Sequence, residues 1–373
     1  ITGFGKVDLT YDVSKTKTFE YSSKINYSNK KNNNDLNFNN DFINQKLINK
    51  NQLIDQKIVL TNKFKENAVI LFSLRYINEK TPQSYFINKF IYQDLFNLEG
   101  NNIEQTSSNK MDYIGFETHL INRNENENLL EIQIGNQFRK DKLTSIFKIK
   151  NDENIVSIPS NYQNTVNYVS NDLYLKLKYG IKFKKVRLDA EAISHQYMNT
   201  LNDTLQQNPF FINPKLGLTW DINQKNRIST SFSLNKTNAK VLNIYNNYIN
   251  TGFRSFSKGT GSLNQLNASL ATLNYTYGSW GDKFFANTYI IYSKNHDYFS
   301  TNSIVTQNYS QSENIIIKNK DILLFSSNID KYFKPILTNL KFTFGGRKSS
   351  FQNIVNNANL RTVINNSVNY GFE

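Results

Sequence analysis

Residues 268–293, ASLATLNYTYGSWGDKFFANTYIIYS, contain two strand-like arms joined by a polar turn. The second arm has apolar residues at successive positions, so its two faces stay unassigned. Gly278, Gly281 and Asp282 between the arms favour a tight turn. The first arm alternates with a period of two, with Ser269, Ala271, Leu273, Tyr275 and Tyr277 on one face and Thr272, Asn274 and Thr276 on the other. The stretch therefore predicts a β-hairpin with two unlike faces.

The composition narrows the kind of protein that could contain such hairpins. Of 373 residues, 38% are hydrophobic and the mean hydropathy is −0.56, below the roughly 45–50% apolar share of a soluble globular domain. The 27 Phe and 22 Tyr contradict the aromatic-poor composition of disordered chains. The sequence has no apolar run of about 18 residues, so membrane-spanning helices are excluded. A membrane β-barrel remains, because only alternate residues of each strand must be apolar.

Strand-like alternation recurs along the whole chain and predicts an all-β, antiparallel transmembrane barrel. About fifteen segments have close to the 9–11 residues that a tilted strand needs to cross a bilayer. They are 3–11, 19–27, 54–64, 68–77, 111–121, 129–139, 171–179, 183–195, 215–221, 227–235, 265–277, 284–294, 320–330, 336–346 and 362–373. We interpret 142–150, KLTSIFKIK, as a hairpin extension inside a long loop at 140–170.

Short and long connections alternate between these segments. The short ones are 13–18, 122–128, 221–226, 278–283 and 331–335, and the long ones are 28–53, 78–110, 196–214, 236–264 and 295–319. Outer-membrane barrels have periplasmic turns and longer external loops, which is the same layout. All five prolines are expected in loops or at strand starts. Trp220 and Trp280 adjoin short turns, so we expect both at the periplasmic membrane interface.

Four stretches resemble the barrel region of TonB-dependent receptors of the Bacteroidetes or Flavobacteria type. They are NPFFINPKLGLTWDINQKNRISTSFSLN (208–235), NTGFRSFSKGTG (250–261), NHDYFSTNSIVTQNYSQSENIIIKNKD (295–321) and NIVNNANLRTVINNSVNYGFE (353–373). The resemblance implies a barrel of about 22 strands with an N-terminal plug, energised through TonB. We expect residues 1–373 to be an interior barrel segment of a longer protein, with the plug, the TonB contact and the final strands outside this chain.

The sequence offers no enzyme, metal or cofactor signature. Cysteine is absent, which removes zinc knuckles and thiol nucleophiles. His119, His195 and His296 lie far apart, without other ligands at metal-binding spacing. We therefore expect neither catalysis nor a bound metal or cofactor.

The candidate recognition residues lie in two long connections. Residues 243–259, NIYNNYINTGFRSFSKG, combine aromatic rings with a guanidinium, and such side chains often anchor binding surfaces. A second candidate is NHDYF at 295–299. The predicted ligand contacts are Tyr245, Tyr248, Phe253, Arg254, Phe256, His296 and Tyr298. Packing between loops is the competing interpretation for the first group.

The charge and the layout leave three functional hypotheses. A net charge of +14 and a pI near 9.5 raise nucleic acid as a partner, but the basic residues are scattered and no nucleic-acid motif is present. Outer-membrane lipid and anionic lipopolysaccharide explain them better. The first hypothesis is an outer-membrane transporter of a bulky nutrient such as an oligosaccharide, peptide or metal chelate. The second is a non-transporting, receptor-like barrel that docks an outer-membrane lipoprotein or another assembly partner, and the third is a soluble all-β carbohydrate-binding protein.

Overall fold

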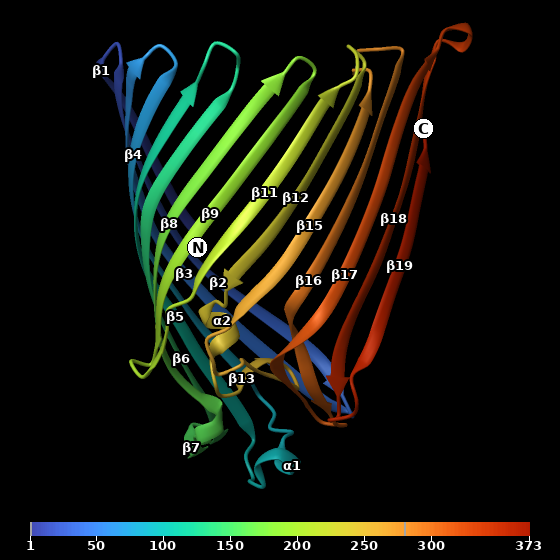
Figure 1. Ribbon diagram of the computed structural model, residues 1–373. Coiled ribbons are helices and arrows are strands. Elements are labelled where there is room, and N and C mark those ends of the chain that lie inside the picture. The colour runs from blue at the N-terminus through green and yellow to red at the C-terminus, as the bar shows by residue number, and fades with distance from the viewer. Residues whose placement is uncertain (1, 280) are drawn as a thin grey trace.

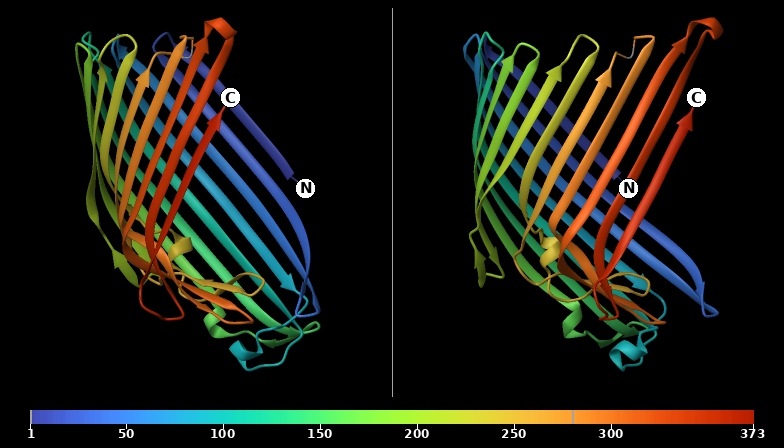
Figure 2. Two further views of the ribbon diagram at one scale, coloured as in Figure 1. Left: turned by 90° about the vertical axis from the view of Figure 1, so that its right-hand side faces the viewer. Right: turned by 45° about the vertical axis from the view of Figure 1, so that its right-hand side comes forward.

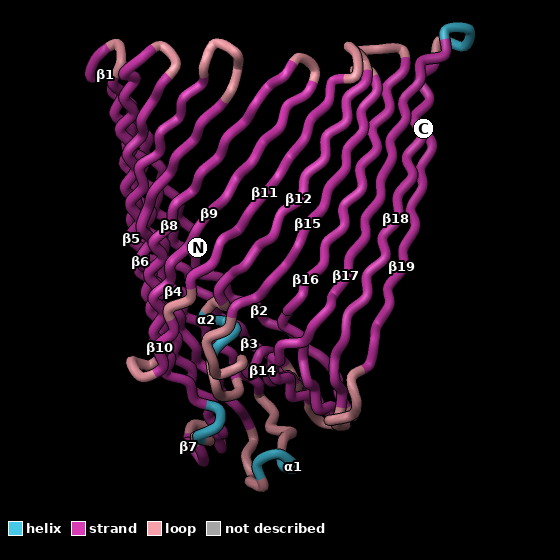
Figure 3. Tube along the Cα trace, viewed as in Figure 1, coloured by secondary structure: helices cyan, strands magenta, loops and turns pink. Residues whose placement is uncertain are grey.

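A single, strongly curved β-sheet forms the body of the molecule (Figure 1). The computed structural model describes residues 2–279 and 281–373. Nearly all strand pairs are antiparallel, and most join strands that follow one another along the chain through the hairpin turns visible in Figure 3. Among the described residues, β1 pairs only with β2 and β19 pairs only with β18, so the wall is not closed.

The sheet contains nineteen strands within the described residues. Fifteen of them, each of 12 residues or more, make the wall: β1 (Thr2–Ser14), β2 (Lys17–Phe38), β3 (Asp41–Lys65), β4 (Ala68–Ile87), β5 (Asn102–Arg123), β6 (Leu129–Asn151), β8 (Gln163–Phe183), β9 (Val186–Leu201), β11 (Phe210–Asp221), β12 (Asn226–Asn238), β15 (Gln265–Tyr277), β16 (Phe284–Val305), β17 (Ser310–Phe333), β18 (Thr338–Val355) and β19 (Arg361–Phe372). The short elements are β7 (Asn154–Ser157), β10 (Leu205–Gln207), β13 (Ile249–Gly252), β14 (Ser255–Lys258), the helices α1 (Gln93–Phe96) and α2 (Val241–Ile244), and two 3₁₀ turns (Ser160–Tyr162 and Lys334–Ile336). No described helix is long and apolar enough to cross a membrane.

The predicted all-β, antiparallel barrel architecture is confirmed, and each of the fifteen expected segments overlaps a different one of the fifteen wall strands, with 183–195, 336–346 and 362–373 extending up to three residues beyond theirs. The strands run well beyond the expected limits on the long-loop side. Residues 28–53 form the far half of the β2–β3 hairpin, which turns at Asn39 and Asn40 with positive φ. The interpretation of 142–150 was wrong in detail, because β6 continues through these residues and pairs with β5 and β8.

The pairing register assigns the faces of the hairpin at 268–293. Leu273 lies opposite Ile290 and Tyr275 opposite Thr288, so the second arm shares its outer face through Ile290 and Tyr292. On the inner face, Asn287 donates hydrogen bonds to Asn274 and Thr276 at 3.0 and 2.9 Å. The convex face of this hairpin therefore carries apolar side chains, whereas the concave face combines hydrogen-bonded polar residues with Tyr289 and Ile291.

Two of the five prolines depart from the expected placement. Pro82 lies inside β4 and Pro214 inside β11. The β3–β4 register is interrupted between the pairs Asn49–Gln83 and Gln52–Lys80, and pairing of β11 with β12 starts only at Lys215. Each proline therefore sits where one ladder is missing, so its lack of an N–H breaks no bond on that side.

Candidate functional site

The connection between β12 and β15, residues 239–264, folds across the concave face near the long-loop end of the wall. It contains α2, β13 and β14, which lie between the walls in Figure 1 and in both views of Figure 2. We call residues 239–264 the mouth loop. β14 pairs in parallel with the start of β17, and the backbone N–H of Asn250 donates to Gln105 Oε1 of β5 at 3.1 Å. The mouth loop thus joins wall strands that are far apart around the sheet.

An aromatic cluster holds the mouth loop in place. Phe256, 1% exposed, lies at its centre. Its ring centroid is 5.2 Å from Tyr92, 5.6 Å from Phe147 and 5.3 Å from Tyr162. The ring planes cross at 70–79°, the edge-to-face arrangement that aromatic pairs prefer. We call Tyr92, Phe96, Phe147, Tyr162 and Phe256 the mouth cluster.

Arg254, at the tip of the mouth loop, bonds to the β4–β5 connection and to the β16–β17 turn. Its backbone N–H donates to the hydroxyl of Tyr92 at 3.3 Å. Its guanidinium donates to the backbone carbonyls of Asn308, at 2.9 Å, and Gln307 in the β16–β17 turn. The same guanidinium lies 4.6 Å from the centre of the Phe38 ring at the tip of the β2–β3 hairpin.

Polar contacts also join the mouth loop to β8 and β17. The backbone N–H of Asn247 donates to Asn164 Oδ1 at 3.0 Å, and the Asn164 amide donates back to the Asn247 carbonyl at 3.1 Å. Lys258 Nζ lies 3.1 Å from Glu313 Oε1 of β17. The two bonds with Asn164 satisfy the backbone N–H and carbonyl of Asn247 where this irregular segment meets the wall.

Burial also changes the acidity of the cluster. Removal from water disfavours a charged phenolate and raises the pKa of Tyr92 to about 12, although the hydrogen bond from the Arg254 backbone opposes this change. Burial likewise raises the pKa of Tyr162. Both hydroxyls are therefore neutral at physiological pH and can donate as well as accept.

The structure brings four of the predicted ligand contacts in the mouth loop to the mouth cluster, places Tyr245 in a second buried cluster, and leaves His296 and Tyr298 on β16, apart from both. Tyr245 and Phe256 are buried in packing, and Tyr248, Phe253 and Arg254 lie around the mouth cluster. Ligand binding by these five stays a prediction, and contact through Tyr245 or Phe256 requires the mouth loop to move. His296 is exposed at an interruption of the β16–β17 register. Tyr298 is buried, and its hydroxyl donates to the carbonyl of Gln352 at 2.8 Å.

One of the two predicted interface tryptophans can be placed. Trp220 lies at the end of β11, next to a short turn, with 43% of its surface exposed. It is opposite Ile228 and Val186, in the row of the convex face. Trp280 lies outside the described residues, so the shared interface stays a prediction.

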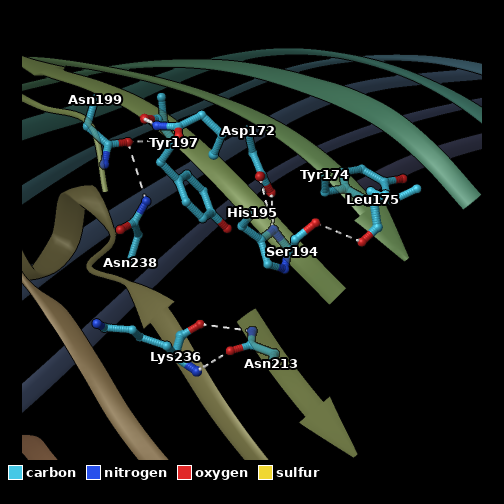
Figure 4. A network of polar contacts seen from close by, with 12 residues as sticks. Asp172, Tyr174, Leu175, Ser194, His195, Tyr197, Asn199, Asn213, Lys236 and Asn238 are labelled. Carbon is cyan, nitrogen blue, oxygen red and sulfur yellow. Dashed lines mark hydrogen bonds and ion pairs between the residues drawn. The ribbon is translucent and has the colours of Figure 1, made fainter. Parts of the chain in front are cut away.

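The concave wall carries a polar network that the sequence analysis did not single out (Figure 4). His195 Nδ1 lies 3.0 Å from both carboxylate oxygens of Asp172, and the His195 ring stacks on Tyr197 at 5.5 Å. Deeper along β8, the hydroxyl of Tyr174 donates to Glu117 Oε2 at 2.7 Å. The alternation of Asp172 and Tyr174 with the apolar Leu173 and Leu175 was the available signal for an inward polar row.

Nearer to the short turns, ion pairs line the concave face of the wall. Lys178 bonds Glu131 at 3.0 Å and Lys176 lies 3.2 Å from Glu191, both across neighbouring strands. A cavity of about 360 Å³ opens beside them; its lining includes Lys178, Arg187, Asp189, Glu191, Lys215 and Asn274. His119 Nε2 is 3.7 Å from Glu131. Within the described residues, no three side chains of the His, Asp and Glu types gather in a metal-binding group.

A polar concave wall, an apolar convex face and an inward-folded loop at one end together define the fold of outer-membrane β-barrel transporters. The copper transporter OprC aligns with a TM-score of 0.60 at 7% identity, over 94% of this chain and 52% of that one. The RagAB peptide transporter aligns with a TM-score of 0.56 at 8% identity, over 94% and 46%. The siderophore receptor PiuA from Acinetobacter baumannii aligns with a TM-score of 0.53 at 9% identity, over 93% and 61%.

These three proteins are named as transporters or receptors rather than as enzymes. The chain spans about half of the length of the solved structures that it matches. No family model and no curated protein matches the sequence. The likeness is therefore one of fold, at identities of 7–9%.

Proposed function

We propose that residues 1–373 form part of the wall of an outer-membrane transporter of the TonB-dependent receptor class, and that the mouth loop controls entry from outside. The supporting observation is that the sheet has an apolar convex face and a polar concave face, and that the mouth loop lies across the concave face. An apolar convex face suits lipid, and a concave face with paired charges suits a hydrated passage. The mouth loop then separates this passage from the long-loop side.

A bulky, polar nutrient such as an oligosaccharide, a peptide or a metal chelate fits a passage lined by amides, carboxylates and ammonium groups. Tyr248, Phe253 and Arg254 are the proposed first contacts, because they lie at the outer end of the passage and are not fully buried. Energy would come from TonB through a region outside this chain, and a Bacteroidetes-type receptor with a lipoprotein partner is the proposed setting.

A reversible lock on the mouth loop tests the transport role. Ser255 and Ser310 are register partners in the parallel β14–β17 pair, and the chain has no cysteine of its own. Neighbouring strands lie about 4.8 Å apart, within the range that a disulfide spans. The double variant Ser255→Cys/Ser310→Cys should therefore fix the mouth loop to the wall on oxidation and release it on reduction.

The assay uses the full-length protein in a deletion strain of its source bacterium, grown on oligosaccharides, peptides or ferric chelates as sole nutrients. The oxidised double variant should lose growth on the transported nutrient and regain it after reduction, while Ser255→Cys and Ser310→Cys alone behave as wild type. If deletion itself changes growth on none of these nutrients, the non-transporting docking barrel is the better explanation.

A further inference from the structure

A small cavity lies on the concave face, where the long-loop ends of β2, β3 and β4 meet β13 of the mouth loop. Its volume is about 250 Å³. Nine residues line it, and five of them carry side-chain amides: Asn32, Asn34, Gln45, Gln83 and Asn250. None of these nine residues carries a charge. We call this space the amide cavity.

The pairing register explains why the wall residues of the amide cavity gather here. Asn34 of β2 is opposite Gln45 of β3, and Asn32 is opposite Leu47. Leu47 is in turn opposite Tyr85 of β4. Alternate residues of a strand share a face, so these side chains all lie on the concave face. Leu47 and the Tyr85 ring therefore give an apolar side to a cavity that is otherwise mostly polar.

The most buried amide of the cavity has an unused acceptor. Asn250 is 4% exposed. Its amide nitrogen donates to the carbonyls of Gly252 at 3.1 Å and Ser255 at 3.3 Å, which fixes the orientation of the amide group. Its Oδ1 is buried and accepts no hydrogen bond from the described residues. A buried acceptor without a partner is destabilising, so a ligand that donates to this oxygen is favoured.

The wall side of the amide cavity offers donors. The Tyr85 hydroxyl donates to Gln45 Oε1, which leaves the Gln45 amide nitrogen as a donor. The side chains of Asn32, Asn34 and Gln83 are exposed and form the open side of the cavity. The amide cavity thus combines donors, acceptors and an apolar side.

We propose that the amide cavity binds one uncharged ring of an oligosaccharide that enters through the mouth. Sugar hydroxyls both donate and accept hydrogen bonds, as side-chain amides do. The C–H face of a sugar ring is apolar and can pack against Leu47 and the ring of Tyr85. The inference rests on the proposed transport function and narrows its cargo to a neutral oligosaccharide.

The charge and size of the amide cavity disfavour the other cargoes. A charged chelate or a peptide terminus would lose its hydration there without meeting an opposite charge. The volume is just below the roughly 300–1,000 Å³ of pockets for drug-sized ligands, so it suits one ring of a longer chain. An uncharged internal peptide segment is the competing occupant, but an extended backbone fits a groove better than a compact cavity.

Binding to an array of neutral and acidic oligosaccharides tests the proposal, with the full-length protein in detergent micelles. Wild type should bind neutral members of the array. Asn32→Ala/Asn34→Ala/Gln83→Ala, the cavity variant, should bind the same oligosaccharides about a hundredfold more weakly, because each lost hydrogen bond weakens binding about fivefold. These three side chains are exposed, so the wall does not depend on them. Heat-modifiable gel mobility checks that the variant is folded.

The matched control removes three exposed amides from the convex face of β2 and β3. Asn33→Ala/Asn37→Ala/Gln52→Ala should bind as wild type, because these residues alternate with those that face the cavity. Protease resistance of the mouth loop is a second readout, since a bound ring contacts both Asn250 and the wall. The oligosaccharide should increase this resistance in wild type and in the control, but not in the cavity variant.

Two results overturn the proposal: wild type binds no neutral oligosaccharide, or wild type and the cavity variant bind equally. Binding of acetylated and amidated uncharged peptides that is lost in the cavity variant assigns the cavity to peptide instead. If the cavity variant loses oligosaccharide binding but the deletion strain grows normally on the same oligosaccharides, the binding site stands and the transport role fails.

Discussion

Arg254 donates its backbone N–H to the hydroxyl of Tyr92 at 3.3 Å, although 162 residues separate them in the chain. Tyr92 belongs to the β4–β5 connection and Arg254 to the mouth loop, and the Arg254 guanidinium also bonds the β16–β17 turn. Three connections from different parts of the wall therefore meet at one point. Movement of the mouth loop must break contacts with both of the other connections, so we expect the mouth to open cooperatively.

The first prediction concerns Phe256, the central ring of the mouth cluster, and its effect on opening of the mouth loop. Phe256→Ala removes three edge-to-face contacts and leaves a cavity, which should lower the free energy of opening of the mouth loop by about 3–5 kcal/mol. Hydrogen exchange of residues 239–264 should accelerate, while the wall strands keep their protection. Leu242→Ala, at a side chain 63% exposed on α2, is the control and should change little. Unchanged exchange in Phe256→Ala would show that other contacts hold the loop.

The two faces of β12 provide the second prediction. Phe232, 48% exposed, is on the convex face, whereas Ser231 bonds Thr272 at 2.7 Å on the concave face. Phe232→Arg should impair assembly by about 2–4 kcal/mol if the ring lies near the middle of the bilayer, because a charge there meets hydrocarbon. Ser231→Arg places the same charge in the polar interior and should assemble nearly normally. Equal defects of the two variants in heat-modifiable gel mobility would refute this assignment of the faces.

The wall strands could be predicted from the sequence because lipid and water impose opposite demands on alternate residues. Leu173 and Leu175 alternate with Asp172 and Tyr174, and that contrast is readable in any single strand. The contrast is lost in the far half of the β2–β3 hairpin, where Asn and Lys occupy positions on both faces although Ile43 on one face is fully buried. Those residues are Asn-rich and were expected to form a loop, yet backbone pairing continues through them.

The mouth cluster could not be predicted from the sequence, for a different reason. The aromatic residues of 243–259 were recognisable, but their partners Tyr92, Phe147 and Tyr162 come from three other connections or strands. No local pattern links such distant positions, so the sequence could indicate an unusual loop without deciding between ligand contact and packing. The network of Asp172 and His195 was missed for the same reason, since the two residues are on neighbouring strands and 23 positions apart.

The acidity of Tyr92 provides the third prediction. Its pKa is raised to about 12 in the folded protein, against about 10 for an unperturbed tyrosine. The folded state therefore favours the neutral phenol, so its stabilising contribution is complete below about pH 10 and is lost as the pH rises through the folded value. Proteolysis of the mouth loop should increase between about pH 10 and 12, with a smaller increase in Tyr92→Phe. The same increase in both proteins would assign the effect to other tyrosines.

Two glycines of the mouth loop provide a matched pair for the last prediction. A Cβ on Gly259 would lie 2.4 Å from the carbonyl oxygen of Tyr245 and 2.7 Å from that of Asn243, whereas a Cβ on Gly252 would meet nothing within 4 Å. Backbone oxygens cannot move aside as a flexible side chain can, so Gly259→Ala should displace α2 from β14 and open the mouth loop to protease. Gly252→Ala adds the same methyl group without a clash and should keep wild-type resistance. Both variants should retain normal barrel mobility on gels, because the mouth loop adds few bonds to the wall ladder. Equal protease resistance of the two would mean that the close approach of residues 243–245 to Gly259 does not hold the loop closed.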